Sequence, residues 1–143
     1  MRIMTRDDIL GLLDRRQMAW NARNAAALAA LHATDGVVAS PTGGVLEGRP
    51  EIERIYRLWL SAFPDLVMEA EEVVIEGSRV AQIVRVTGRH DGDFFGIAPT
   101  GRHVEAQMAS VMTVADGLIT EERRIFDFTG VLLQVGVLKA KPA

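Results

Sequence analysis

The stretch HVEAQMASVMTVADGLITEERRIFDF, residues 103–128, holds two strand-like runs on either side of an Asp-Gly pair. Such a pair between two runs is the strongest short-range signal of a β-hairpin, because both residues tolerate the positive φ that a tight turn requires. The sequence therefore predicts an antiparallel hairpin that turns at Asp116 and Gly117.

A second pair of strands precedes this hairpin. The run VMEAEEVVIE leads to a Glu-Gly-Ser turn, and RVAQIVRVTGRH returns from it. The loop HDGDFFGIAPTGRHV, residues 90–104, then joins the two strand pairs and is unusually apolar for a loop, with Phe94 and Phe95 near its centre. We expect this loop to fold over the mouth of a pocket or to pack against a partner subunit.

Helical patterns occupy the first part of the chain. Thr5 and Asp8 form a capping-box pattern before a helix that is expected to run to about Asn21. Asn24 is expected to cap a shorter helix, AAALAALHA, and a short strand GVVA follows at residues 36–39. The clearest helix starts near Pro50 and has apolar residues at helical spacing: Ile52, Ile55, Tyr56, Trp59, Leu60 and Phe63. The tail from residue 130 is expected to be a last short helix or an extended segment.

Helices followed by a meander of strands indicate an α+β fold, and nothing in the sequence suggests a linker within residues 1–143. Long antiparallel strands must curl around the N-terminal helices in order to bury an apolar face. The sequence therefore predicts a single domain built as a cone-shaped barrel, in which a strongly curved, mainly antiparallel β-sheet wraps around the N-terminal helices. The open end of such a cone forms a pocket.

The composition excludes several classes of function. A net charge of −3 provides no basic surface for nucleic acid and no polybasic strip for a membrane. The chain has no cysteine, and hence no thiolate zinc site, and it lacks the familiar nucleotide, zinc-protease and serine-hydrolase motifs. We therefore expect no metal, no cofactor, no nucleic-acid partner and no membrane partner. A cytoplasmic location is also expected, because the N-terminus has acidic residues where a signal peptide needs an apolar core.

Asp127, in RRIFDF, is the most informative candidate for chemistry. On a continued strand it would share a face with Arg123 and Ile125, and it stands between two phenylalanines. One interpretation is a strand-end aspartate that hydrogen-bonds a nearby turn or pairs with an arginine. The other is a general base in an apolar pocket, whose pKa rises because burial disfavours the charged carboxylate.

The other candidates each have a structural and a functional interpretation. His90 is either a solvated loop residue or a hydrogen-bond donor at the rim of a pocket, and His103 has the same two interpretations. The aromatic residues Tyr56, Trp59 and Phe63 are typical of core packing, although Tyr56 and Trp20 carry polar groups that could contact a ligand. Gln82 and Arg85 lie on opposite faces of one strand, so at most one of them faces a cavity.

The order of several motifs resembles that of a known family. The motifs are Trp20-Asn21, Phe63-Pro64-Asp65, GRHDGDFFGIAPTGR (88–102), DGLITE (116–121), Phe126-Asp127 and LLQVG (132–136). This order resembles the SnoaL-like polyketide cyclases of the nuclear transport factor 2-like superfamily, which also contains ketosteroid isomerase and limonene epoxide hydrolase. The resemblance covers nearly the whole chain, and its most specific part is the loop with F-x-G-I-x-P-T-G-R.

The resemblance implies a cone-shaped α+β barrel that assembles into homodimers or larger homo-oligomers. In characterised cyclases, an aspartate on the last long strand removes an acidic proton from a polyketide without metal or cofactor. That family position falls on Asp127, the first-helix aromatic residue on Trp20 and the loop histidine on His90. The cyclases also place a histidine on the preceding strand, where this sequence has Met112 at or beside the position.

These expectations combine into one functional hypothesis with two alternatives. The hypothesis is acid–base catalysis, an aldol-type cyclisation or proton transfer, on a small hydrophobic carbonyl compound. Asp127 would be the base and His90 a supporting donor, and the pocket walls would be Trp20, Tyr56, Trp59, Phe63 and Met112. The alternatives are a non-catalytic module for small-molecule binding or dimerisation, and an epoxide hydrolase. The hydrolase would need a second carboxylate, and none is obvious on the strands.

Overall fold

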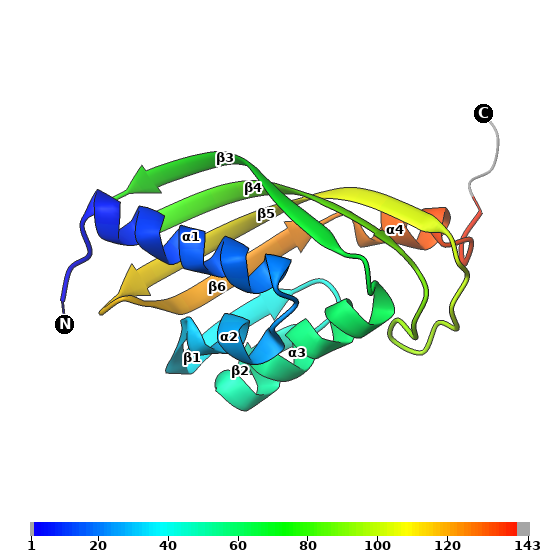
Figure 1. Cartoon of the computed structure of the whole chain (residues 1–143), viewed down its shortest axis with the longest axis horizontal. Helices are drawn as coiled ribbons and strands as arrows, with labels where there is room; N and C mark the ends of the chain where they lie inside the picture. Colours follow the sequence, from blue (N-terminus) through cyan, green and yellow to red (C-terminus); the bar gives the residue numbers. More distant parts are fainter. Residues whose placement is uncertain (1, 140–143) are drawn as a thin grey trace.

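The computed structural model describes residues 2–139 of the chain. The helices are α1 (Arg6–Asn21), α2 (Ala25–Ala30), α3 (Arg49–Ala62) and α4 (Phe128–Gln134). The strands are β1 (His32–Ser40), β2 (Gly44–Glu47), β3 (Val67–Glu76), β4 (Arg79–Arg89), β5 (His103–Ala115) and β6 (Leu118–Phe126). Three helices lie in the first half of the chain, most of the sheet follows, and α4 ends the described part (Figure 1).

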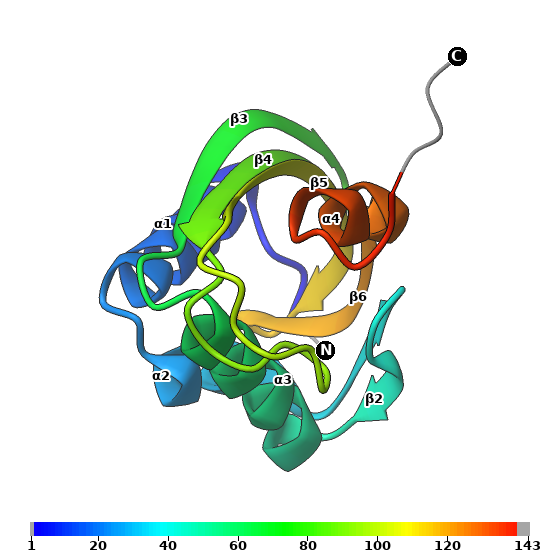
Figure 2. The ribbon, with the colours of Figure 1, turned by 90° about the vertical axis from the view of Figure 1, so that its right-hand side faces the viewer.

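The strands form one six-stranded sheet in the order β2-β1-β6-β5-β4-β3. Neighbouring strands are antiparallel except for β1 and β6, which are parallel. The sheet curls strongly, and α1, α2 and α3 lie along its concave side (Figure 2). The predicted α+β fold, with a curved and mainly antiparallel sheet around N-terminal helices, is confirmed.

Local sequence signals explain where several elements begin and turn. Asp116 and Gly117 have φ values of 54° and 79°, which is the geometry that the Asp-Gly hairpin signal predicts. Thr5 caps α1 through the predicted capping box, in which its hydroxyl accepts from the Asp8 N–H while the Asp8 carboxylate accepts from the Thr5 N–H. Pro50 lies in the first turn of α3, where its missing N–H costs no helical hydrogen bond.

Two boundaries differ from the sequence prediction. Helix α2 ends at Ala30, and His32 already belongs to β1, because β1 is extended by its parallel pairing with β6. Strand β6 ends at Phe126, so Asp127 lies outside the sheet and precedes α4. The tail is a short helix followed by a turn. Within residues 2–139, no helix is both long and apolar enough to cross a membrane.

An irregularity in β6 decides which of its side chains face the interior. Thr113 pairs with Glu121 and Val114 with Ile119, so Thr120 is an extra residue in the ladder. Such a bulge shifts the alternation of side chains by one position. Ile119 is buried before the bulge, and Glu122 and Arg124 are buried after it. The bulge therefore turns a carboxylate and a guanidinium into the core.

Two groups of buried apolar residues fill the inside of the curved sheet. The larger group joins α2, α3, β3, β4, β5 and the loop after β4. The smaller group lies between α1 and the start of β4, the end of β5 and the start of β6. Tyr56 belongs to the larger group and Met112 to the smaller one. Between these two residues lies the network of charged side chains described below.

Candidate functional site

An apolar pocket opens between the helices and the concave face of the sheet. The space between its wall residues amounts to about 600 Å³ when the narrow gaps between atoms and the open solvent at the mouth are included. Its walls are Trp20, Ser40, Trp59, Phe63, Leu66, Met68, Val86, Gly88, Val104, Ala106, Met108, Arg124, Phe126 and Val131. Arg124 is the one charged residue among these, and no carboxylate or histidine of the described residues is part of this wall. The pocket is thus an apolar chamber with a cation in its wall.

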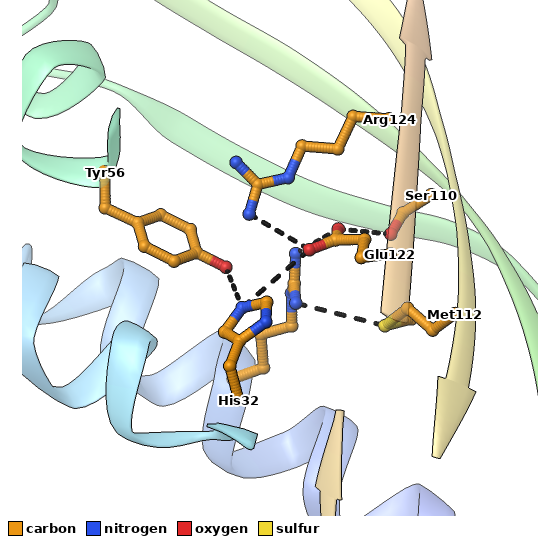
Figure 3. A network of polar contacts seen from close by, with 7 residues as sticks. His32, Tyr56, Ser110, Met112, Glu122 and Arg124 are labelled. Carbon is orange, nitrogen blue, oxygen red and sulfur yellow. Dashed lines mark hydrogen bonds and ion pairs between the residues drawn. The ribbon is translucent and has the colours of Figure 1, made fainter. Parts of the chain in front are cut away.

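Arg124 is held from behind by the buried carboxylate of Glu122 (Figure 3). Arg124 Nη2 donates to Glu122 Oε1 at 3.0 Å, while Arg16 Nη2 donates to Glu122 Oε2 at 2.7 Å. Ser110 Oγ also donates to Oε2, at 2.6 Å. Both carboxylate oxygens therefore accept hydrogen bonds from side chains of α1, β5 and β6, which satisfies the rule that buried charges are paired and hydrogen-bonded.

Tyr56 and His32 complete the network. The guanidinium carbon of Arg124 lies 4.5 Å from the centre of the Tyr56 ring, so the ring face contacts the cation. His32 Nε2 lies 2.7 Å from the Tyr56 hydroxyl and 3.8 Å from Glu122 Oε1. Figure 3 shows both side chains directed toward the carboxylate of Glu122. Both are fully buried, so the network is closed off from water on this side.

The protonation states follow from burial and from the neighbouring charges. Burial alone would raise the pKa of Glu122, but the positive charges of Arg124 and Arg16 hold the pKa of this carboxyl well below its usual value. Burial lowers the pKa of His32 to about 3, although Glu122 opposes this shift. Burial raises the pKa of the Tyr56 hydroxyl. At neutral pH the network therefore holds an ionised Glu122, a neutral His32 and a neutral Tyr56.

The network carries an excess of positive charge. Arg16 and Arg124 are both cations, whereas Glu122 is the one anion that pairs with them among the described residues. Glu122 raises the pKa of Arg124 against the effect of burial, so Arg124 stays protonated. Its Nε is buried and has no hydrogen-bond acceptor within residues 2–139. A ligand with an anionic or carbonyl oxygen would supply both the missing acceptor and the missing negative charge.

The structure does not place Asp127 in the pocket, so the expectation of a desolvated strand carboxylate is wrong. Asp127 is the exposed N-cap of α4, where its Oδ1 accepts from the Gly130 N–H at 2.9 Å. An aspartate at an N-cap commonly accepts a hydrogen bond from a free N–H group of the first helical turn. The structural interpretation of Asp127, as a residue that hydrogen-bonds a nearby turn, matches this geometry.

His90 also lies away from the pocket wall, and it stabilises the loop that follows β4. Its Nδ1 lies 2.9 Å from Thr100 Oγ1 and 3.3 Å from the Thr100 N–H. The main chain adds two further bonds, from the His90 N–H to the Arg102 carbonyl and from the Gly101 N–H to the His90 carbonyl. The motif H-D-G…P-T-G-R thus holds the loop in place through His90, and His90 is not among the residues that line the pocket. His103 is an exposed residue at the start of β5.

The apolar residues of this loop pack inside their own chain. Phe94 is fully buried, and its ring centre lies 4.9 Å from that of Trp59 and 5.3 Å from that of Phe63. Trp59 and Phe63 line the pocket, so the loop supports that wall from behind. The backbone of Gly92 approaches α3 so closely that a Cβ there would lie 2.0 Å from the Ser61 carbonyl oxygen. We expected this loop to fold over the pocket mouth or to pack against a partner subunit. That expectation is wrong for Phe94, whose side chain is buried within its own chain.

The remaining predicted pocket residues divide into two groups. The structure brings Trp20, Trp59 and Phe63 together in the pocket wall. Tyr56 lies behind Arg124, and Met112 lies against Arg16, whose Nη1 is 3.9 Å from the Met112 sulfur. Neither is part of the wall.

The network itself was missed by sequence reasoning: Arg16, His32, Ser110, Glu122 and Arg124. One signal in the sequence points to part of this network. Glu122 and Arg124 alternate with Phe126 on one face of β6, and a face that carries a phenylalanine is expected to be buried. No second carboxylate is obvious on the strands from the sequence, but the structure places one, Glu122, inside the curved sheet. Within residues 2–139, no group of three or more His, Asp or Glu side chains is arranged to hold a metal ion.

The chain is similar to several known proteins. It is 35% identical over 80 residues to nogalonic acid methyl ester cyclase from Streptomyces nogalater, a match that spans 54% of this chain and 60% of that relative. Its fold matches AclR from Streptomyces galilaeus, a candidate hydroxylase, with a TM-score of 0.83, 26% identity and coverage of 96% and 87% of the two chains. It also matches a candidate SnoaL-like polyketide cyclase from Jannaschia sp. CCS1, with a TM-score of 0.83, 24% identity and coverage of 95% and 94%.

The family comparison covers most of the chain. The model of the SnoaL-like polyketide cyclases matches residues 12–135, which include the pocket walls, the charged network and the His90 loop. Because this match spans most of its length, the chain belongs to the SnoaL-like polyketide cyclase family.

Proposed function

We propose that this protein binds a hydrophobic, polyketide-like carbonyl compound in the apolar pocket and stabilises its enolate through Arg124. The observation that carries the proposal is the position of Arg124, a buried cation in an apolar wall with one N–H that lacks an acceptor. Membership of the family and the similarity to a nogalonic acid methyl ester cyclase support the substrate class.

The electrostatic argument concerns a charge that develops on an oxygen. When a carbonyl compound loses an α proton, negative charge accumulates on the enolate oxygen, and a fixed cation in a dry site stabilises this charge. Arg124 is already oriented by Glu122 and Tyr56, so little reorganisation is required at the moment of reaction. The excess positive charge of the network favours an anion over the neutral carbonyl form.

The reaction requires no metal or cofactor in this scheme. The α C–H bond breaks, its proton passes to water at the pocket mouth, and its electron pair is delocalised onto the enolate oxygen beside Arg124. The α carbon then forms a bond to a second carbonyl carbon of the same molecule, and the alkoxide so formed takes up a proton. The pocket wall provides no carboxylate or imidazole of the described residues, so the acidity of the substrate itself and Arg124 must carry the deprotonation.

The ionisation of a bound diketone tests the proposal. 2-Acetyl-1-tetralone is a bicyclic β-diketone whose enolate absorbs at longer wavelength than the neutral compound. A charge-assisted hydrogen bond is worth about 1.5–3 kcal/mol, so saturating protein should lower the pKa of the diketone by about 1–2 units. Arg124→Met should abolish this shift, whereas Arg123→Met, a change at the exposed neighbouring position, should preserve it. An unchanged pKa, or a shift that persists in Arg124→Met, would contradict the proposal.

A second candidate function is non-catalytic binding of the same ligand class. It is favoured by one observation, the lack of a carboxylate or histidine among the described residues of the pocket wall. Hydrogen–deuterium exchange at the α carbon separates the two functions. A catalyst accelerates this exchange in an Arg124-dependent manner, whereas a binding module lowers the diketone pKa without faster exchange.

A further inference from the structure

A serine stands next to Arg124 in the wall of the apolar pocket. Strands β1 and β6 are parallel, and Val38 pairs with Glu122. Both of these residues are buried on the inner face of the sheet. Two residues further along each strand, the side chains return to the same face, and neighbouring strands lie about 4.8 Å apart. This register places Ser40 beside Arg124, and both residues line the pocket.

The hydroxyl of Ser40 is held by the turn that joins β1 to β2. Its Oγ accepts from the Gly43 N–H at 2.9 Å, which uses one lone pair and restrains the side chain. A hydroxyl that accepts keeps its own proton, so Ser40 can also donate a hydrogen bond. Among the described residues of the pocket wall, no other side chain carries an oxygen. An acceptor for this proton on the pocket side must therefore come from a bound ligand.

An enolate oxygen is a suitable acceptor for both neighbours. It has more than one lone pair, so an oxygen that accepts from Arg124 can accept a second hydrogen bond from Ser40. Donors that are already oriented stabilise a developing oxyanion, because no reorganisation is required during the reaction. Ser40 is oriented by the Gly43 N–H, as Arg124 is by Glu122. The two strands together thus present a cation and a neutral donor to one spot of the pocket.

We infer that the Ser40 hydroxyl is a second hydrogen-bond donor to the enolate oxygen that Arg124 binds. The inference rests on the proposed function and adds a residue that contacts the reacting oxygen. The contribution of Ser40 depends on Arg124, because the cation determines where the oxygen lies. Ser40 therefore favours the enolate over the neutral diketone, since a hydrogen bond to a charged acceptor is stronger than one to a neutral acceptor.

Binding of 2-acetyl-1-tetralone to Ser40→Ala tests the inference. Its dissociation constant is measured below the pKa of the diketone, where the neutral form binds, and above it, where the enolate binds. Loss of the donor should weaken enolate binding about fivefold and change binding of the neutral form less than about twofold. A general disturbance of the wall would weaken both forms alike. Ser61→Ala, the same change at an exposed position of α3, should alter neither constant.

A second pair of variants isolates the hydroxyl. Threonine and valine have nearly the same shape, so Ser40→Thr and Ser40→Val differ chiefly in the hydroxyl. Ser40→Thr should bind the enolate as the wild type does, whereas Ser40→Val should resemble Ser40→Ala. When Arg124→Met is already present, Ser40→Ala should weaken enolate binding no further. Circular dichroism of each variant shows whether the fold is retained, and this pair decides the test if Ser40→Ala unfolds.

The results that overturn the inference differ from those that overturn the proposed function. The inference fails if removing the hydroxyl leaves enolate binding unchanged, if both forms are weakened alike, or if Ser40→Thr and Ser40→Val bind the enolate equally. In those cases, an Arg124-dependent pKa shift of the diketone leaves the proposed function intact. If the protein does not change the pKa of the diketone at all, both proposals fail.

Discussion

The two variants Glu122→Gln and Arg124→Met should have unequal effects on stability, although they remove opposite partners of one buried ion pair. The structure holds two guanidinium groups against a single carboxylate. Glu122→Gln removes the negative charge and leaves Arg16 and Arg124 as two uncompensated buried cations. Arg124→Met leaves Arg16 and Glu122 as a neutral pair, which Ser110 still supports.

The expected magnitudes follow from these contacts. Removing one partner of a buried pair and leaving an unpaired charge costs about 3–5 kcal/mol, so we expect this loss for Glu122→Gln. Arg124→Met loses one charge-assisted hydrogen bond, worth about 1.5–3 kcal/mol, and the contact with the Tyr56 ring. It also removes the desolvation cost of the excess cation and the unpaired Nε. Its net cost should be about 1 kcal/mol, at least 2 kcal/mol less than that of Glu122→Gln.

Urea unfolding followed by circular dichroism measures the two free energies of unfolding at pH 7. The matched controls are Glu121→Gln and Arg123→Met, which make the same changes at exposed positions of the same strand. Both controls should remain within about 0.5 kcal/mol of the wild type. Equal losses for Glu122→Gln and Arg124→Met, or a larger loss for Arg124→Met, would refute the argument that the network carries an unneutralised cation.

Three further predictions concern other parts of the chain. The pKa of His32 is about 3 in the folded protein and 6.5 for an ordinary histidine. Between pH 3 and pH 6.5, His32 is therefore protonated in the unfolded chain but not in the folded protein. The free energy of unfolding should therefore fall as the pH decreases below about 6.5, by up to about 1.4 kcal/mol per pH unit, and His32→Gln should flatten this slope while His103→Gln does not. Asp127→Ala should destabilise the protein by about 1 kcal/mol through loss of the α4 cap, and Asp127→Asn, which preserves the cap, should change the free energy of unfolding little; equal losses would dismiss the capping role. Gly92→Ala should lower the thermal midpoint by several degrees, because its Cβ would overlap the Ser61 carbonyl; an unchanged midpoint would show that the loop can move away from α3 without cost.

The hairpins and helices of this protein follow from signals that act over a few residues. The Asp116-Gly117 turn, the Thr5 capping box and the apolar face of α3 all appear where the sequence predicts them, because turn and cap chemistry depends on immediate neighbours. The order of motifs that resembles the family can also be read directly along the chain. Asp127 is an exception, because strand alternation continues through it in the sequence, whereas in the structure β6 ends one residue earlier and Asp127 caps α4 through the Gly130 N–H.

Local patterns in the amino-acid sequence are enough to predict the fold class, the hairpin at residues 116–117 and the family of the chain. The long-range packing of the chain places Arg124 in the pocket wall and gathers the rest of the charged network behind it. Arg16 and Glu122 are 106 residues apart in the chain, and they meet because α1 packs across the sheet. The bulge at Thr120 shifts the alternation of β6 and turns Glu122 and Arg124 inward. Strand periodicity records that alternate residues share a face, but the pairing of β5 with β6 decides which face is buried.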